Sequence, residues 1–268
     1  MGSRLSRVRP FAFGAEEDKM PDFLPDLPVD KILACFARSP GSELKSGKFD
    51  SPESSAALVA NTFGWFLERP ALLPAFVGLG GNPAFSVTLE AEMRFPWAGG
   101  RHPWLDVGIE SDSLLIGVES KRYEPFRPGK TGVFSEAYER DVWGERMRRY
   151  TGLMRDIQAG NQAFGSLDAV QLIKNACGLR TRAIKRARQP VLVYLYAEPP
   201  LWVGSAKPVD PARIAQHRTE VARFGKIVNG DHVTFLPLRW ADVLAQWAAK
   251  PALKAHVAAV VQRFGALG

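Results

Sequence analysis

The 268-residue chain has two cysteines, Cys35 and Cys177, and no stretch of about 18 uncharged apolar residues. Two cysteines so far apart suit neither a disulfide framework nor a zinc site, so we expect both to be small buried residues in a reducing compartment. Without a long apolar stretch we expect no membrane-spanning helix. No apolar segment follows the early arginines, as it would in a secretory signal. We therefore expect a cytoplasmic protein.

Motifs of several large enzyme classes are also incomplete. Gly129-Lys130-Thr131 resembles the end of a Walker A loop, but Glu124 stands where the first glycine is needed. The glycines at 78–81 fail the dinucleotide fingerprint, because Pro83 takes the place of its last glycine. There is no Gly-x-Ser-x-Gly elbow, and the four histidines lack metal-ligand spacing. The sequence thus gives no support to a P-loop, Rossmann or α/β-hydrolase enzyme.

The composition is that of an ordinary globular protein, with 46% hydrophobic and 24% charged residues. The formal net charge is +7 and the sequence pI is about 9.5. A positive charge of this kind favours a polyanionic partner without establishing one.

The order of apolar patterns predicts an α/β fold with a central sheet flanked by helices. We interpret residues 1–50 as a partly irregular N-terminal arm and residues 51–268 as one domain. We expect helices at 53–69, 135–158, 167–187, 211–228 and near the C-terminus, and strands at 85–95, 104–110, 113–121, 191–196 and 232–238. In the first strand, period-two alternation puts the apolar side chains of residues 87, 89, 91 and 93 on one face.

Three residues could carry chemistry together. Asp106 lies on the second expected strand, and Glu119 and Lys121 lie two residues apart on the third, so that their side chains share a face. The hairpin between the strands would bring the two carboxylates together, and such oxygen ligands suit Mg²⁺. The Lys121 ammonium could hold or deprotonate an attacking water, or neutralise charge in the transition state. A plain salt bridge at a strand end is the alternative, and Glu17-x-Lys19 shows that the triplet also arises elsewhere.

The stretches Leu105-Asp106-Val107 and Ile116-Gly117-Val118-Glu119-Ser120-Lys121 resemble the PD-(D/E)xK nuclease superfamily. Further stretches are similar to a bacterial branch of nuclease-like proteins: Ser54–Leu58 with Asn61–Phe63, Glu124-Pro125-Phe126, Gln171–Lys174 with Gly178-Leu179, and Glu198-Pro199-Pro200. The similarity covers roughly residues 50–240. One departure is Leu105, which stands where the motif has proline.

The resemblance implies a restriction-endonuclease-like core, with a central mixed β-sheet flanked by helices. Asp106 and Glu119 would bind one or two Mg²⁺ ions, with Mn²⁺ as a substitute and the Ser120 carbonyl as a further ligand. Lys121 would orient or activate the water that attacks a phosphodiester. Glu92 would be an accessory metal ligand, although Glu90 competes for this role and a solvent-facing glutamate is the alternative.

Other residues are candidates for the same function. Gln171 resembles the polar residue that often follows the core motif, and a plain helix-surface glutamine is the alternative. A basic run could bind phosphates through counterion release, or it could be a solvated helix end that complements the helix dipole. Its members are Arg180, Arg182, Lys185 and Arg186.

From these observations we expect a Mg²⁺-dependent deoxyribonuclease that acts by water attack on DNA. The alternative is a nucleic-acid-binding or catalytically inactive member of the same fold. The sequence leaves open RNA as a substrate, sequence specificity, endo or exo action, and oligomeric state, a homodimer included.

Overall fold

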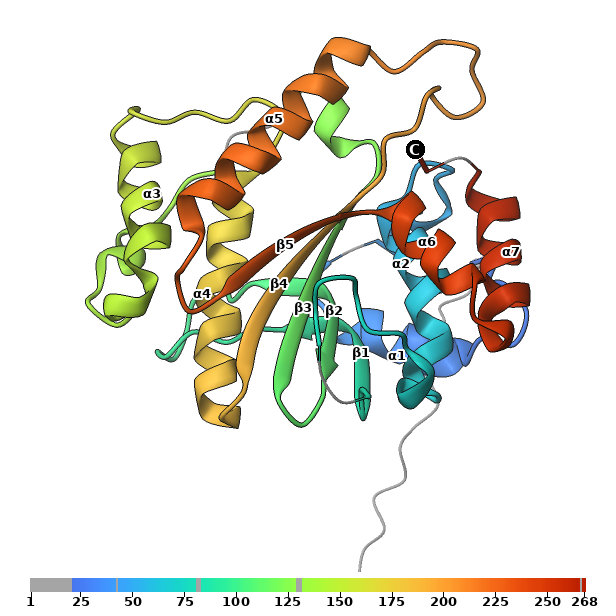
Figure 1. Cartoon of the computed structure of the whole chain (residues 1–268), viewed down its shortest axis with the longest axis horizontal. Helices are drawn as coiled ribbons and strands as arrows, with labels where there is room; N and C mark the ends of the chain where they lie inside the picture. Colours follow the sequence, from blue (N-terminus) through green and yellow to red (C-terminus); the bar gives the residue numbers. More distant parts are fainter. Residues whose placement is uncertain (1–20, 42, 81–82, 129–131, 266) are drawn as a thin grey trace, which may run out of the picture.

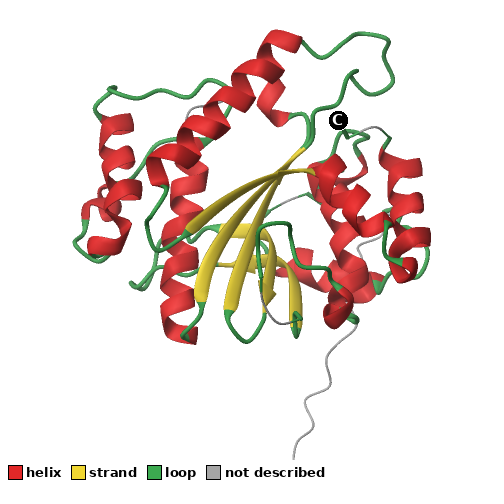
Figure 2. Ribbon diagram, viewed as in Figure 1, coloured by secondary structure: helices red, strands yellow, loops and turns green. Residues whose placement is uncertain are grey.

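The computed structural model describes residues 21–41, 43–80, 83–128, 132–265 and 267–268, and shows a five-stranded mixed sheet between two groups of helices (Figures 1 and 2). The strands lie side by side in chain order: β1 (Ser86–Glu92), β2 (Trp104–Glu110), β3 (Leu114–Lys121), β4 (Gln189–Tyr196) and β5 (Thr234–Arg239). The first three are antiparallel, and β3, β4 and β5 are parallel. The expected α/β class is confirmed. The first twenty residues of the predicted arm and Gly129-Lys130-Thr131 lie outside the described residues.

Each face of the sheet carries its own helices and its own hydrophobic cluster (Figure 1). One face is covered by α1 (Val29–Arg38), α2 (Ser55–Phe63), α6 (Trp240–Ala248) and α7 (Lys254–Phe264). The other is covered by α3 (Arg148–Gln158), α4 (Ala169–Arg186) and α5 (Pro211–Val228). Among the described residues, no helix is both long and apolar enough to cross a membrane.

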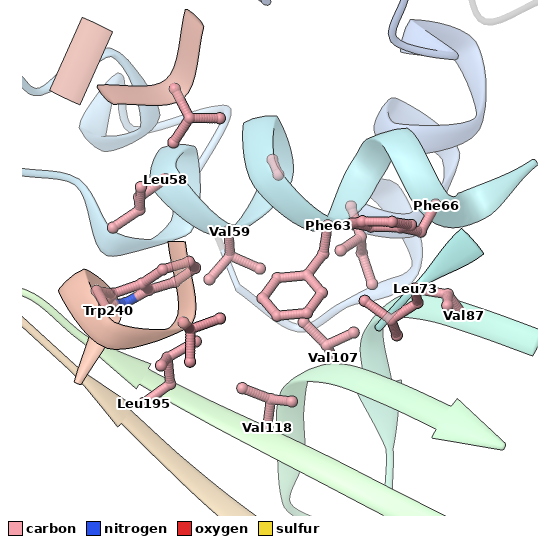
Figure 3. Packing of buried hydrophobic residues seen from close by; sticks show 14 of the residues in the cluster. Leu58, Val59, Phe63, Phe66, Leu73, Val87, Val107, Val118, Leu195 and Trp240 are labelled. Carbon is pink, nitrogen blue, oxygen red and sulfur yellow. The ribbon is translucent and has the colours of Figure 1, made fainter. Parts of the chain in front are cut away.

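On the first face, α2 lies across the sheet with its apolar side chains towards the strands. Figure 3 shows Val59 and Phe63 pointing at Val107 of β2 and Val118 of β3. The ring of Trp240 lies 5.9 Å from that of Phe63, and its indole N–H donates a hydrogen bond to the Ser120 hydroxyl. This packing fixes the end of β3 that carries the acidic motif.

The β1–β2 ribbon twists so sharply that residues two apart on one strand face opposite cores. Leu89 and its partner Val107 belong to the first cluster, whereas Ala91 and its partner Leu105 belong to the second. Between them, Glu90 has a left-handed backbone with φ of 49°. The predicted alternation of buried and partly exposed residues is confirmed, but residues 87 and 89 face one core and residues 91 and 93 face the other, because the positive φ rotates the strand at Glu90.

The predicted strands are confirmed within three residues, and the helix over 211–228 is confirmed at both ends. The helix predicted over 135–158 is confirmed only from Arg148, because Gly144 with φ of 69° and the short turns before it interrupt the helix. Helix α1 was not predicted. Its Ile32, Cys35 and Phe36 are buried in the first cluster, so part of the segment expected to be an arm belongs to the core.

The close approach of α4 to the β1–β2 connection gives a test of this packing. A Cβ at Gly178 would lie 2.5 Å from the main-chain oxygen of Met93, whereas a Cβ at Gly152 in α3 would meet nothing within 4 Å. We expect Gly178→Ala to lower the free energy of unfolding by about 1–3 kcal/mol through overpacking. Gly152→Ala should raise it by about 0.5–1 kcal/mol, since alanine is the better helix former. Urea unfolding of both variants measures this, and equal effects would contradict the helix placement.

Candidate active site

The Glu119–Lys121 pair projects from β3 towards α4. The Lys121 Nζ lies 2.6 Å from Glu119 Oε1, as the two-residue spacing on one strand predicted. The Glu119 side chain is only 3% exposed, and its second oxygen accepts a hydrogen bond of 2.7 Å from the Asn175 side chain of α4. Both carboxylate oxygens are therefore held in place from inside the protein.

Asp106 stands where β2 leaves β3. The pairing of the two strands ends at Val107 and Val118, and beyond it the Asp106 Oδ2 accepts a hydrogen bond of 2.6 Å from the Ser120 amide. The Asp106 side chain thus accepts the hydrogen bond from the Ser120 amide that a neighbouring strand would otherwise accept. The Lys121 carbonyl accepts a hydrogen bond from the Ala197 amide, on the side of β3 that faces β4. Successive residues of a strand direct their main-chain amide and carbonyl to opposite sides of the strand. The Ser120 carbonyl therefore points to the same side as the Ser120 amide, towards Asp106.

The two carboxylates share a poorly hydrated space. Burial, followed by the negative charge of Glu119, raises the pKa of Asp106 well above its ordinary value, while Lys121 acts in the opposite direction. Burial alone would lower the pKa of Lys121, but the charges of Glu119 and Asp106 outweigh burial and raise it. When both carboxyl groups are ionised, they therefore carry more negative charge than the one ammonium balances, an arrangement that a cation would stabilise.

Of the two glutamates on β1, Glu90 belongs to this group. It lies opposite Asp106, between the pairs Leu89–Val107 and Ala91–Leu105. Burial raises its pKa to about 7, with a further rise from the charge of Glu119 and a lowering by a hydrogen bond from Ser39. Glu92 is further along the strand and faces Arg94 at 3.9 Å. Charge interactions thus relate Glu90, rather than Glu92, to Asp106 and Glu119.

Helix α4 brings two amide side chains to the site. Gln171, in its first turn, lines a cavity together with Lys121 and Tyr194. Asn175, one turn later, contacts Glu119 directly and was not singled out from the sequence. Its spacing of four residues from Gln171 on one helix face was the signal that could have found it.

The basic run lies towards the other end of α4. Arg180 donates a hydrogen bond to the Val142 carbonyl, and Arg182 forms an ion pair of 2.9 Å with Glu110. Lys185 and Arg186 are exposed in the last turn, about 15 Å along the helix axis from Asn175. The structure does not bring this run together with the acidic residues, and its role as a phosphate-binding surface stays a prediction.

The donor groups at this position fit a divalent cation such as Mg²⁺. Carboxylates of Asp106 and Glu119 and the Ser120 carbonyl are hard oxygen donors, and each carboxylate oxygen has a second lone pair beside its hydrogen bond. Within the part of the chain that the structure describes, no three His, Cys, Asp or Glu side chains gather where they could hold a metal ion. The set thus consists of two carboxylates, one carbonyl and positions left for water.

Comparisons with known proteins add no relative to this picture. No protein-family model, no curated protein and no solved structure matches the chain. The likeness to the PD-(D/E)xK superfamily therefore rests on the motif residues and their arrangement.

The crowding of carboxylates predicts how stability responds to charge removal. Asp106→Asn keeps an acceptor for the Ser120 amide but removes a buried negative charge, so we expect the Tm in the presence of a chelator to rise by about 2–4 °C. Mg²⁺ should raise the Tm of the wild type, because it binds the folded state, and should raise that of Asp106→Asn much less. The exposed Asp141→Asn serves as control. A wild-type Tm that does not change when Mg²⁺ is added would contradict this expectation.

Proposed function

We propose that this protein is a Mg²⁺-dependent nuclease that hydrolyses phosphodiester bonds in DNA. The observation that carries the proposal is the meeting of Asp106, Glu119 and Lys121 at one end of the sheet, where buried carboxylates from neighbouring strands face an ammonium group. The mixed sheet with helices on both faces agrees with the restriction-endonuclease-like core that the motif resemblance implies.

Each residue has a role that follows from its position. Asp106, Glu119 and the Ser120 carbonyl would hold the cation, which would supply Lewis-acid stabilisation of charge on the phosphodiester. The Lys121 ammonium, fixed by its ion pair, orients the attacking water and neutralises charge that develops on the phosphate oxygens. Asn175 positions Glu119, and Gln171 stands at the cavity where substrate approaches.

A binding module of the same fold is the second candidate. One observation favours it: Lys121 and Asn175 already engage both oxygens of Glu119, which is the state expected of a site that never takes a metal. The same contacts would also hold Glu119 in position to bind a metal ion, so a cleavage assay distinguishes the nuclease from the binding module.

Plasmid cleavage with Mg²⁺ or Mn²⁺ tests the nuclease. We expect the wild type to cut and Lys121→Ala and Asp106→Ala to lose roughly a hundredfold or more of the rate, since each change removes charge stabilisation or a metal ligand. A chelator should abolish cleavage. The exposed Lys207→Ala, which removes a lysine elsewhere, should cut like the wild type. Salt-sensitive DNA binding without cleavage, unaltered by metal, would instead identify the binding module.

The two β1 glutamates give a matched pair for the third acid. We expect Glu90→Gln to slow cleavage roughly 10- to 100-fold, because Glu90 lies opposite Asp106 and shapes its surroundings. Glu92→Gln should cut at nearly the wild-type rate, since Glu92 faces Arg94 instead. Initial rates at saturating Mg²⁺ measure both. The reverse order would restore Glu92 as the accessory ligand.

A further inference from the structure

A cleft of about 710 Å³ adjoins the acidic group. It shares Lys121 and Gln171 with the site, and Tyr194 of β4 forms part of its lining. One wall is the segment 124–128 that follows β3, and the other is the segment 160–168 that leads into α4. The cleft therefore opens beside the Glu119–Lys121 pair, next to β3 and β4.

The Glu119 and Lys121 side chains are recessed beside this cleft. The Glu119 side chain is 3% exposed and that of Lys121 is 19% exposed. A volume of this size lies in the range of pockets that take a single small ligand. One or two unpaired nucleotides fit a volume of this size, whereas the bases of a paired duplex stay stacked on their neighbours and do not enter it.

The side chains that line the cleft favour binding by base stacking over binding by charge attraction. Among the described lining residues, the positive charges of Lys121 and Arg127 are matched by Glu124 and Asp168, and Arg127 is paired with Glu53. Affinity from counterion release would need an excess of positive charge. Phe164 supplies an aromatic ring instead, held by the Arg223 guanidinium, which lies 4.2 Å from the ring centroid. Aromatic side chains of this kind bind bases of any sequence by stacking.

We propose that this cleft binds unpaired nucleotides of a DNA strand and that Phe164 is the stacking residue, so that single-stranded DNA or an unpaired end is the substrate. This inference rests on the proposed nuclease function and specifies which form of DNA that site accepts.

Binding of fluorescent oligonucleotides by the full chain tests the inference without catalysis, in the presence of a chelator. We expect a single strand to bind more tightly than a blunt duplex of the same sequence. Phe164→Leu, which keeps apolar volume against Phe224 but removes the ring, should weaken single-strand binding about tenfold. Phe164→Tyr should restore it. Phe85→Leu is the matched control, because Phe85 also lies beneath an arginine, Arg188, and is 50% exposed, but it lies beside Glu110 at the far end of β2.

Duplex binding as tight as single-strand binding would overturn the inference, and so would unchanged binding by Phe164→Leu when circular dichroism shows that it is folded. Cleavage assays separate this failure from that of the nuclease itself. Metal-dependent cutting with equal use of both DNA forms overturns only the cleft assignment. Single-strand binding that depends on Phe164, with no cutting of any DNA, overturns the nuclease and leaves the cleft assignment standing.

Discussion

The hydrogen bond from the Ser120 amide to the Asp106 carboxylate is the contact on which the site depends. It takes the place of a main-chain pair, so β2 can leave β3 without leaving an amide unpaired at a residue that is 1% exposed. An unpaired amide there would cost about 1–3 kcal/mol. The separation of the two strands leaves the Ser120 carbonyl on the side of β3 that faces Asp106. In the proposed function, one acidic side chain would thus both shape the sheet and supply a ligand.

The two hydrophobic cores keep these charges together. Because the β1–β2 ribbon twists at Glu90, Leu89 and Val107 are fixed in one core and Ala91 and Leu105 in the other. The strands are therefore anchored on both sides of the twist, and the carboxylates cannot move apart to relieve their repulsion. A left-handed backbone at a glutamate costs of order 1–3 kcal/mol and persists where the surroundings enforce it. Packing energy spread over the two cores maintains a locally unfavourable arrangement of charges, which the cation of the proposed function would stabilise.

Much of this arrangement follows from the sequence, and the exceptions have physical reasons. The spacing of Glu119 and Lys121 on one strand is a local property, so their shared face was predictable. The twist at Glu90 was not, because glutamate gives no sign of a positive φ and the period-two pattern of β1 looks regular. Helix α1 was predictable from the spacing of Ile32, Cys35 and Phe36, but these few apolar residues lie in a polar, proline-rich region that favoured an irregular arm. Which glutamate joins Asp106 depends on that tertiary twist.

The distribution of positive charge explains how a basic protein can have a cleft in which the charges of the described lining residues balance. The net charge of +7 is spread over the molecule, and Arg180 and Arg182 of the basic run contact the Val142 carbonyl and Glu110. Such a diffuse field attracts a polyanion from a distance and accelerates encounter, but it does not distinguish single from double strands. In the proposed function, selection would then fall to short-range contacts at the cleft, where the Phe164 ring would act only on nucleotides that have left the stack. Long-range attraction and local selection would therefore reside in different parts of the surface, and each could be changed without the other.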